Sequence, residues 1–313
     1  MDFIGRRLVI AVLTLFLVSA LTFAAFAVIP GDPASLMLGT EATDEQLEAL
    51  RKELGLDRSL PEQYVAWLGR FLTGSLGNST RFRGTSITDL VLERLPVTFA
   101  LAALSLTFIL LIATSIALLN VKEHSPIDHV VNTLTTISIS APGFFLGVLF
   151  IWVFGLILRC FVPGNYVSYK EDFGAFLGYL VFPALAIALP NAAIVIKFLR
   201  GSIFQQLRND YVRTAYSKGA SQRLVLYRHV LKNAVIPALT LMGMIIGDVF
   251  SGSIVIEQVF TIPGLGRLLI ASITSRDYPL IQTLVVYITC IVVLANTLVD
   301  IAIQIIDPRI RVK

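Results

Sequence analysis

Charge is scarce in this sequence of 313 residues, since Asp, Glu, Lys and Arg make up only 15 % of it while 56 % is hydrophobic. Soluble domains carry about 25 % charged residues, which they need to cover a surface that faces water. The deficit, with a mean hydropathy of +0.79, argues against a soluble globular protein. It indicates that lipid covers much of the surface.

Residues for redox and metal chemistry are also few. The two cysteines, Cys160 and Cys290, show no C-x-x-C spacing. They are interpreted as small apolar residues, and a disulfide between them is the alternative. There are three histidines, His124, His129 and His229, and their spacing is not that of metal ligands. All three fall in or beside segments that are expected below to be cytoplasmic loops. No metal site is predicted.

Patterns that carry catalysis are missing as well. There is no G-x-x-x-x-G-K-[ST] sequence, so this chain is not expected to bind ATP through a P-loop. An intramembrane protease would need paired aspartates or a Ser/His set within apolar stretches. Only Asp248 lies deep in such a stretch, and Asp300 is near the end of another. The sequence therefore predicts a protein that is not an enzyme.

Long apolar stretches are abundant instead. A membrane-spanning helix needs about 20 apolar residues, and six stretches qualify. They are 8–29, 96–121, 130–158, 173–196, 234–256 and 278–299. The third is long enough to be tilted or interrupted, with Pro142–Gly143 as the candidate hinge, and Pro183 and Pro190 could kink the fourth. The predicted fold is an all-α integral membrane protein with six transmembrane helices.

The first stretch has an alternative interpretation. Arg6 and Arg7 before an apolar run also resemble a secretory or twin-arginine signal. Signal cores are about 7–15 residues long, and this run extends from residue 8 to residue 29. A retained transmembrane helix is therefore expected.

Basic residues gather in the segment 197–233, which holds eight Lys or Arg residues and one acid, Asp210. The net charge of +4 is thus concentrated between spans, which indicates topology and not nucleic-acid binding. Positive loops stay in the cytoplasm. Six spans then place both termini there, and the segment 31–95 outside. The expected division is 1–30, 31–95 and a core of 96–313 with the cytoplasmic loop 197–233.

The outer segment is expected to contain two helices. Residues 43–56 carry leucines at a spacing of three and four, with Asp44 as a possible cap and Gly55 as the end. A second helix is predicted over 61–72, where a proline suits the first turn. These helices are expected to pack on the membrane domain and to offer a docking surface for an external partner.

The basic segment is expected to form two short amphipathic helices joined at Gly219. In the first, Tyr211, Ala215 and Lys218 share one side. Ser221 caps the second, whose predicted apolar face is Leu224, Val225, Val230 and Leu231. Adhesion to anionic lipid is the general alternative for such a loop.

Two stretches of this segment, 211–221 (YVRTAYSKGAS) and 228–237 (RHVLKNAVIP), resemble the EAA loop of ABC importer permeases. The likeness is greatest to the branch that imports dipeptides, oligopeptides and nickel. Typical of that branch are also the sequences at 30–33 (PGDP), 257–260 (EQVF), 263–267 (PGLGR), 276–279 (RDYP) and 307–311 (DPRIR). Where the general pattern has Glu-Ala-Ala, this chain has Arg213-Thr214-Ala215.

The resemblance implies a type I importer permease subunit in the cell inner membrane. Its partners would be a second, homologous permease, one or two cytoplasmic ATPases that hold ATP and Mg²⁺, and an external solute-binding protein. ATP binding would close the ATPases, draw the coupling loops together and turn the cavity outward. The residues expected to contact the ATPases are Tyr211, Arg213, Thr214, Ala215, Lys218, Gly219, Ala220 and Ser221. Arg213 and Lys218 could pair with acidic groups there.

A translocation path is predicted around Asp248, because a charge within a span is costly unless it meets water or a polar partner. Small residues surround it, Ser251 among them. A positive group, such as a peptide amino terminus or a metal ion, would suit Asp248. The alternative is a buried hydrogen bond to a neighbouring helix. Asn191 and Asn296 are weaker candidates, for which an interhelical hydrogen bond is the alternative.

The expected function is therefore import of short peptides, with nickel or a nickel chelate as the rival within the family. An ATP-independent channel, a secondary carrier and a structural scaffold are the alternatives from other classes. Substrate identity is not encoded in this chain alone, because the external binding protein does most of the selection in such systems.

Overall fold

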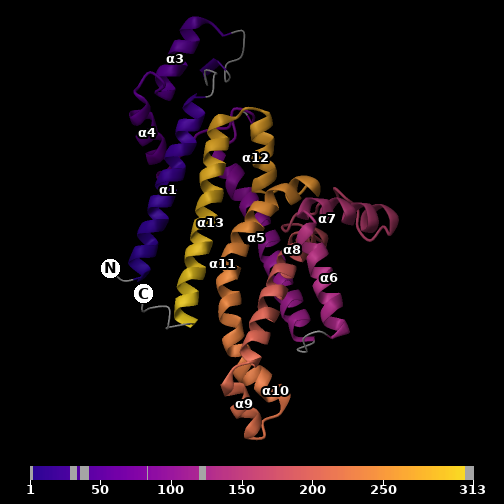
Figure 1. Cartoon of the computed structure of the whole chain (residues 1–313). Coiled ribbons are helices and arrows are strands. Elements are labelled where there is room, and N and C mark those ends of the chain that lie inside the picture. Colours follow the sequence, from indigo (N-terminus) through magenta and orange to yellow (C-terminus); the bar gives the residue numbers. More distant parts are fainter. Residues whose placement is uncertain (1–2, 29–33, 36–41, 83, 120–124, 307–313) are drawn as a thin grey trace. The chain divides into compact units, whose positions relative to one another are not determined.

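The computed structural model describes residues 3–28, 34–35, 42–82, 84–119 and 125–306, and Figure 1 shows their path. This part of the chain is helical, and its only β-pairing is an isolated bridge between Asn78 and Ser86. The stretches quoted above at 30–33 and 307–311, and His124, lie outside the described residues.

The described helices follow one another with short connections. In chain order they are α1 (Phe3–Val28), α3 (Asp44–Leu54), α4 (Leu60–Thr73), α5 (Ile87–Leu119), α6 (Pro126–Ser140), α7 (Gly143–Phe150), the π-helical η1 (Ile151–Ile157), α8 (Phe173–Leu207), α9 (Asp210–Ser217), α10 (Gln222–Val225), the π-helical η2 (Leu226–Val230), α11 (Leu231–Val259), α12 (Leu265–Thr274) and α13 (Tyr278–Ile306).

Five helical runs are long and apolar enough to cross a membrane: α1, α5, α8, the run from α10 through α11, and α13. The third predicted span, 130–158, is a bent pair that we call the broken span, in which α6 and the run from α7 through η1 meet at 98°. Ala141 and Pro142 are both extended at the break, and for Ala141 this is the conformation that the ring of a following proline favours. The interruption predicted at Pro142–Gly143 is confirmed, and six spans result when the pair counts as one.

The fourth span is longer than predicted. The apolar stretch ends at Ile196, but α8 continues to Leu207. Lys197 donates to the Thr136 hydroxyl at 2.8 Å, and Arg200 pairs with Asp128 at 2.6 Å. Because both cations find partners on α6, the helix continues where a solvated loop was expected. Pro183 and Pro190 lie inside this helix.

Contacts divide the chain into two units, and each is described by itself. Unit 1 comprises Met1–Val97 and Pro263–Val293, and unit 2 comprises Thr98–Ile262 and Leu294–Lys313. The predicted division at residues 30 and 95 follows topology and not packing, and it stays a prediction.

In unit 1, α4 packs on the first span. The Tyr64 hydroxyl lies 2.8 Å from the Ser19 hydroxyl, and the Tyr64 ring meets Phe23 edge-on. Packing of the outer helices on the membrane domain is thus confirmed for α4. Thr43, and not Asp44, caps α3, since its hydroxyl accepts from the Gln46 backbone N–H.

The same unit has an apolar core where α5 begins and α12 and α13 meet. Its buried members are Ile87, Leu90, Val91, Leu265, Leu268, Leu280 and Leu284. Beside it lies Asp277, a fully buried carboxylate between α12 and α13. Its Oδ2 accepts from the Ser79 hydroxyl at 2.5 Å and from the Arg81 backbone N–H at 3.2 Å. Asp277 therefore ties the outer segment to the start of α13.

In unit 2, α8 is the most buried of the long helices. It packs against α6, α7 and α11. At its first half the Tyr179 hydroxyl donates to the Phe260 carbonyl at 2.6 Å and accepts from the Gly164 backbone N–H at 2.9 Å. One side chain of α8 thus holds both the end of α11 and the connection after η1.

Gly147 lets α7 approach α11. A Cβ at this position would lie 3.1 Å from Phe260 Cε2 and 3.2 Å from Ile256 Cδ1. Gly147→Val is expected to lower the free energy of unfolding by about 1–3 kcal/mol, as overpacking does in a well-packed core. Thermal unfolding of the purified chain in detergent measures this. Gly178→Val in α8, where no atom lies within 4 Å of the added Cβ, is the matched control, and equal shifts for both would contradict the argument.

Candidate coupling elbow and solute path

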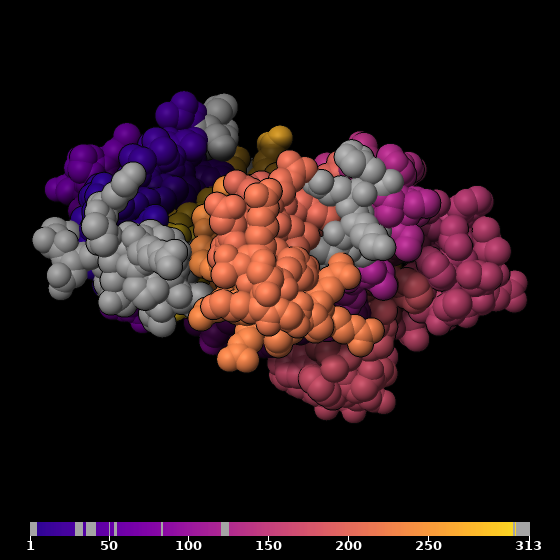
Figure 2. Space-filling model, turned by 60° about the horizontal axis from the view of Figure 1, so that its bottom comes forward, coloured from indigo at the N-terminus to yellow at the C-terminus, as the bar shows by residue number. Residues whose placement is uncertain are grey.

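Residues 208–230 form a folded projection that we call the elbow. It leaves α8 at Arg208, contains α9, α10 and η2, and returns into α11. Figure 1 labels α9 and α10 at the ends of α8 and α11, and Figure 2 turns this end toward the viewer. Gly219 makes the turn between the two short helices with φ of +80°, a conformation that glycine adopts without strain. The predicted first helix and the bend at Gly219 are confirmed, but the second helix is not a separate short one, because α10 continues through η2 into α11.

The elbow has its own apolar core. Val212, Val225 and Val230 are at most 1 % exposed. They pack with Leu199 and Ile203 of α8 and with residues of α5 and α11. The elbow is therefore joined by close packing to three long helices, and a displacement of one displaces the others.

Polar contacts support the same connection. The Tyr211 hydroxyl donates to Gln206 Oε1 at 2.8 Å and accepts from Asn233 Nδ2 at 3.4 Å. Tyr211 thus links the end of α8 to the start of α11. Ser221 caps α10 as predicted, because its hydroxyl accepts from the Leu224 backbone N–H.

The predicted coupling residues divide between the inside and the outside of the elbow. Tyr211, Ala215 and Ala220 pack against its core. Five others are exposed: Arg213, Thr214, Lys218, Gly219 and Ser221. Lys218 therefore does not share the packed side of Tyr211 and Ala215, as the spacing had predicted. Arg213 lies 3.8 Å from Asp210, but both side chains are largely in solvent, and such pairs contribute little stability.

Sequence reasoning missed three features of this surface. Leu224 was predicted on the inner face but is 45 % exposed, and Tyr216 and Tyr227 are 42 % and 57 % exposed. Val212, which was given no role, is buried instead. Exposed large apolar side chains beside basic residues are typical of a protein-binding surface. Spacing within each short helix does not show which of its sides docks on α5, α8 and α11, so it could not identify these exposed residues.

The second candidate site is a row of exposed residues along α11. At a spacing of three and four they share one side of the helix. They are Pro237, Thr240, Met244, Asp248, Ser251, Val255 and Gln258. The opposite side is buried, with Ala238, Ile245, Val249 and Ile256 among its members. Four of the seven residues in this exposed row are polar, namely Thr240, Asp248, Ser251 and Gln258, which is unlike a face covered by lipid tails.

Asp248 lies in the middle of this row. Its side chain is exposed, and no other described residue gives it a hydrogen bond or an ion pair. The buried interhelical bond that was the alternative for Asp248 is therefore not formed among the described residues. Asn191 donates to the Ile187 carbonyl of its own helix at 2.9 Å, so the interhelical bond considered for it is also not formed. Asn296 Oδ1 is buried without a partner among the described residues.

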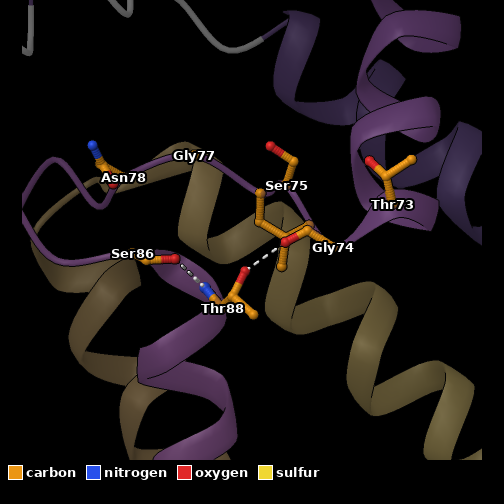
Figure 3. A pocket seen from close by; sticks show the side chains of 8 residues that line it. Thr73, Gly74, Ser75, Gly77, Asn78, Ser86 and Thr88 are labelled. Atoms are coloured by element: carbon orange, nitrogen blue, oxygen red, sulfur yellow. Dashed lines mark hydrogen bonds between the residues drawn. The ribbon is translucent and has the colours of Figure 1, made fainter.

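An open depression of about 480 Å³ lies on the outer segment, and Figure 3 shows it. Its walls come from the end of α4, the following turn and the start of α5. Thr88 closes one side by donating its hydroxyl to the Gly74 carbonyl at 2.8 Å. The lining is uncharged, and it consists of Thr73, Gly74, Ser75, Leu76, Gly77, Asn78, Ser86 and Thr88.

Metal ligands are not gathered anywhere in the described ranges, where no group of three His, Cys, Asp or Glu residues could hold an ion. His129 and His229 are exposed, and Cys160 and Cys290 are free thiols.

Comparison with known proteins decides the family. Residues 109–312 match the binding-protein-dependent transport system inner membrane component, and residues 1–102 match the N-terminal part of such membrane components. The chain belongs to this family. It is therefore an integral inner-membrane permease subunit of an ABC transporter and not an enzyme, as its sequence predicted. Membership also means that it works with other components of the transporter.

Similar proteins cover the permease from end to end. A probable peptide ABC transporter permease of Sinorhizobium fredii is 36 % identical over 310 residues, which are 99 % of each chain. A putative peptide permease of Brucella suis is 36 % identical over 98 % of each chain. The oligopeptide transport system permease AppB of Bacillus subtilis is 33 % identical over 99 % of each chain.

Proposed function

We propose that this permease forms one half of the translocation path of an ATP-driven importer of short peptides. The full-length similarity to permeases that are named for peptides supports this substrate class over nickel. A second, homologous permease would supply the other half. An external solute-binding protein would deliver the peptide and do most of the selection.

The elbow carries the mechanism. Its exposed Tyr216, Leu224 and Tyr227 lie among basic side chains, and its inner side is fixed to α5, α8 and α11. One or two cytoplasmic ATPases, which hold ATP and Mg²⁺, would grip this surface. Closure of the ATPases would move the elbow, and the packed helices would transmit that movement to the path.

Orientation follows from the elbow. The positive-inside rule places its basic residues in the cytoplasm, together with both termini. The outer helices α3 and α4 and the depression at Gly74 then face outward. There they are available to the solute-binding protein.

The row on α11 would line the path. A peptide has a positive amino terminus and a polar backbone, and Asp248, Ser251 and Gln258 offer one carboxylate and two hydrogen-bonding groups along one side of the helix. Asn191 and Asn296 are secondary candidates. The buried acceptor of Asn296 would need a partner from water or from another subunit.

The elbow's role is tested by the ATPase that co-purifies with the complete transporter from detergent-solubilised membranes. Gly219→Val places a branched side chain at a φ of +80°. A residue other than glycine in this left-handed conformation costs about 1–2 kcal/mol of conformational free energy. The distorted turn is expected to lower ATPase recovery about fivefold, because a loss of about 1 kcal/mol in binding has this effect.

Gly74→Val is the matched control. Gly74 has φ of +74°, and neither glycine has an atom within 4 Å of the added Cβ. The backbone strain is therefore alike, but only Gly219 lies in the elbow. Equal ATPase recovery from the two variants would refute the proposed coupling surface.

A further inference from the structure

An ion pair between a buried arginine and a partly buried aspartate joins α6 to α8 near the elbow. Arg200 Nη2 lies 2.6 Å from Asp128 Oδ1, and the two side chains are 6 % and 22 % exposed. The Arg200 guanidinium also lies over the Phe204 ring at 5.3 Å. The contact between Lys197 and Thr136 joins the same two helices at a second level. These bonds have no role in the coupling surface or in the row on α11.

Stability alone is a poor explanation for such a pair. Removing two charges from water offsets most of their attraction, and apolar residues of similar volume often stabilise a protein as well or better. What the pair adds is a defined relative position of the two helices, because a charge-assisted hydrogen bond has one favoured geometry. It fixes the register of α6 along α8, whereas apolar packing alone tolerates sliding.

The ion pair lies close to the elbow core, so the register that it fixes bears on how the elbow is connected to α6. Arg200 lies two turns before the end of α8, in the same helical segment as Leu199 and Ile203, which belong to the elbow core. That core takes side chains from α5, α8, α9, α10, η2 and α11, and none of its described members comes from α6. The elbow core is therefore packed directly to three long helices, and α6 in turn packs on one of them, α8.

At its C-terminal end α6 leads into the second half of the broken span, which is α7 and η1. It ends at Ser140, the chain bends by 98°, and α7 then contacts α11 at Gly147. A shift of α6 thus bears on α7 and, through α7, on the helix that carries Asp248. Loss of register between α6 and α8 would weaken the connection from the elbow to α6 and α7.

We propose that Asp128 and Arg200 form a latch, by which movement of the elbow is passed to α6 and, beyond the bend, to α7. The inference rests on the proposed coupling function of the elbow. Both residues are positioning residues, since neither lies on the proposed path row or on the elbow.

One test measures movement directly. Spin labels at Val130→Cys of α6 and Gln222→Cys of the elbow, both exposed sites, report their distance in the complete transporter after Cys160 and Cys290 are replaced by serine. With the latch intact, one distance distribution is expected with and without ATP. In Asp128→Asn the distribution should shift or split when ATP binds. Two results would overturn the proposal. One is a distance distribution in Asp128→Asn that does not change when ATP binds. The other is a distribution that already changes with ATP when the latch is intact.

A second test uses peptide uptake per ATP hydrolysed, in vesicles that contain the complete transporter. Asp128→Asn and Arg200→Gln are expected to lower this ratio about fivefold while ATP hydrolysis continues, within the usual range for coupling residues. Asp128→Glu should restore it. Asp172→Asn, which changes a carboxylate that caps the other end of α8, should leave it unchanged. If Asp128→Asn leaves the ratio of uptake to hydrolysis unchanged, the ion pair has a structural role only. This holds even if the variant yields less folded permease.

The two tests separate the latch from the proposed function. If wild-type vesicles hydrolyse ATP without taking up peptide, the substrate assignment fails, and the distance measurement still decides on the latch.

Discussion

Uptake of a short peptide with a free amino terminus is expected to fall about tenfold in Asp248→Asn, equivalent to about 1.4 kcal/mol of lost stabilisation. Asp248 is exposed in the middle of an apolar helix and has no partner among the described residues. A central aspartate in lipid costs about 2.5–3.5 kcal/mol. Water in a path removes this cost, and the carboxylate is then available to a cation that passes.

The measurement is peptide uptake into vesicles that contain the complete transporter. Asp248→Glu keeps the charge and should retain most of the uptake. Ser251→Ala, one turn along the same row, removes a hydroxyl without a charge and should have a smaller effect.

Stability distinguishes a path residue from a packing residue. Because Asp248 is exposed, Asp248→Asn should change the free energy of unfolding by no more than about 0.5 kcal/mol. Unchanged uptake in Asp248→Asn would end the assignment of this row to the path, and a large loss of stability would restore the packing interpretation.

Much of the fold was predictable because a membrane imposes strong rules on sequence. A span must be apolar over about 20 residues, and a proline can interrupt a helix, as at Pro142, although Pro183 and Pro190 lie inside α8. Both rules act locally, and both predictions are confirmed. The end of α8 was not predictable in the same way, because Lys197 and Arg200 have basic side chains that bond to α6, some 60 to 70 residues away in sequence.

In the elbow, too, local features were predictable from the sequence and contacts between distant segments were not. Its two helices, its glycine turn and its Ser221 cap follow from local rules. Which side chains face inward depends on how α9 and α10 dock on α5, α8 and α11. The apolar pattern of the second helix placed Leu224 inside, and docking places it outside.

The row on α11 was recognised at Asp248 and Ser251 because polar residues within an apolar span are conspicuous. Met244 and Val255 belong to the same row but look like ordinary apolar residues in the sequence. Their place depends on which side of α11 is occupied by α7 and α8, and only the packing shows this.

Asp277 was quoted only as part of a family-like stretch, and its removal has the largest expected effect on stability. Asp277→Ala is expected to lower the free energy of unfolding by roughly 3 kcal/mol or more, since each buried donor that is left without a partner costs about 1–3 kcal/mol. Three donors are affected: the Ser79 hydroxyl and the backbone N–H groups of Arg81 and Leu280. Thermal unfolding of the purified permease in detergent measures the loss.

A local readout is available beside the global one. Arg81 donates from its guanidinium to the Ala271 carbonyl at 2.8 Å, and Ser79 also accepts from the Phe82 backbone N–H at 2.9 Å. Both contacts depend on the turn that Asp277 holds. Cleavage by trypsin after Arg81 should therefore be faster in Asp277→Ala. Asp57→Ala removes an exposed carboxylate from the same outer segment and should change neither measurement.

Asp277→Asn separates the charge from the shape. The amide keeps one oxygen acceptor but turns two N–H donors toward groups that are themselves donors, so one or more of the three bonds must be lost. Its expected loss of stability is smaller than that of Asp277→Ala but still well above that of Asp57→Ala. If Asp277→Asn unfolds like the wild type, then the carboxylate is not what fixes this turn. The link between residues 79–82 and the start of α13 would then have to depend on the apolar core around Leu280 and Leu284.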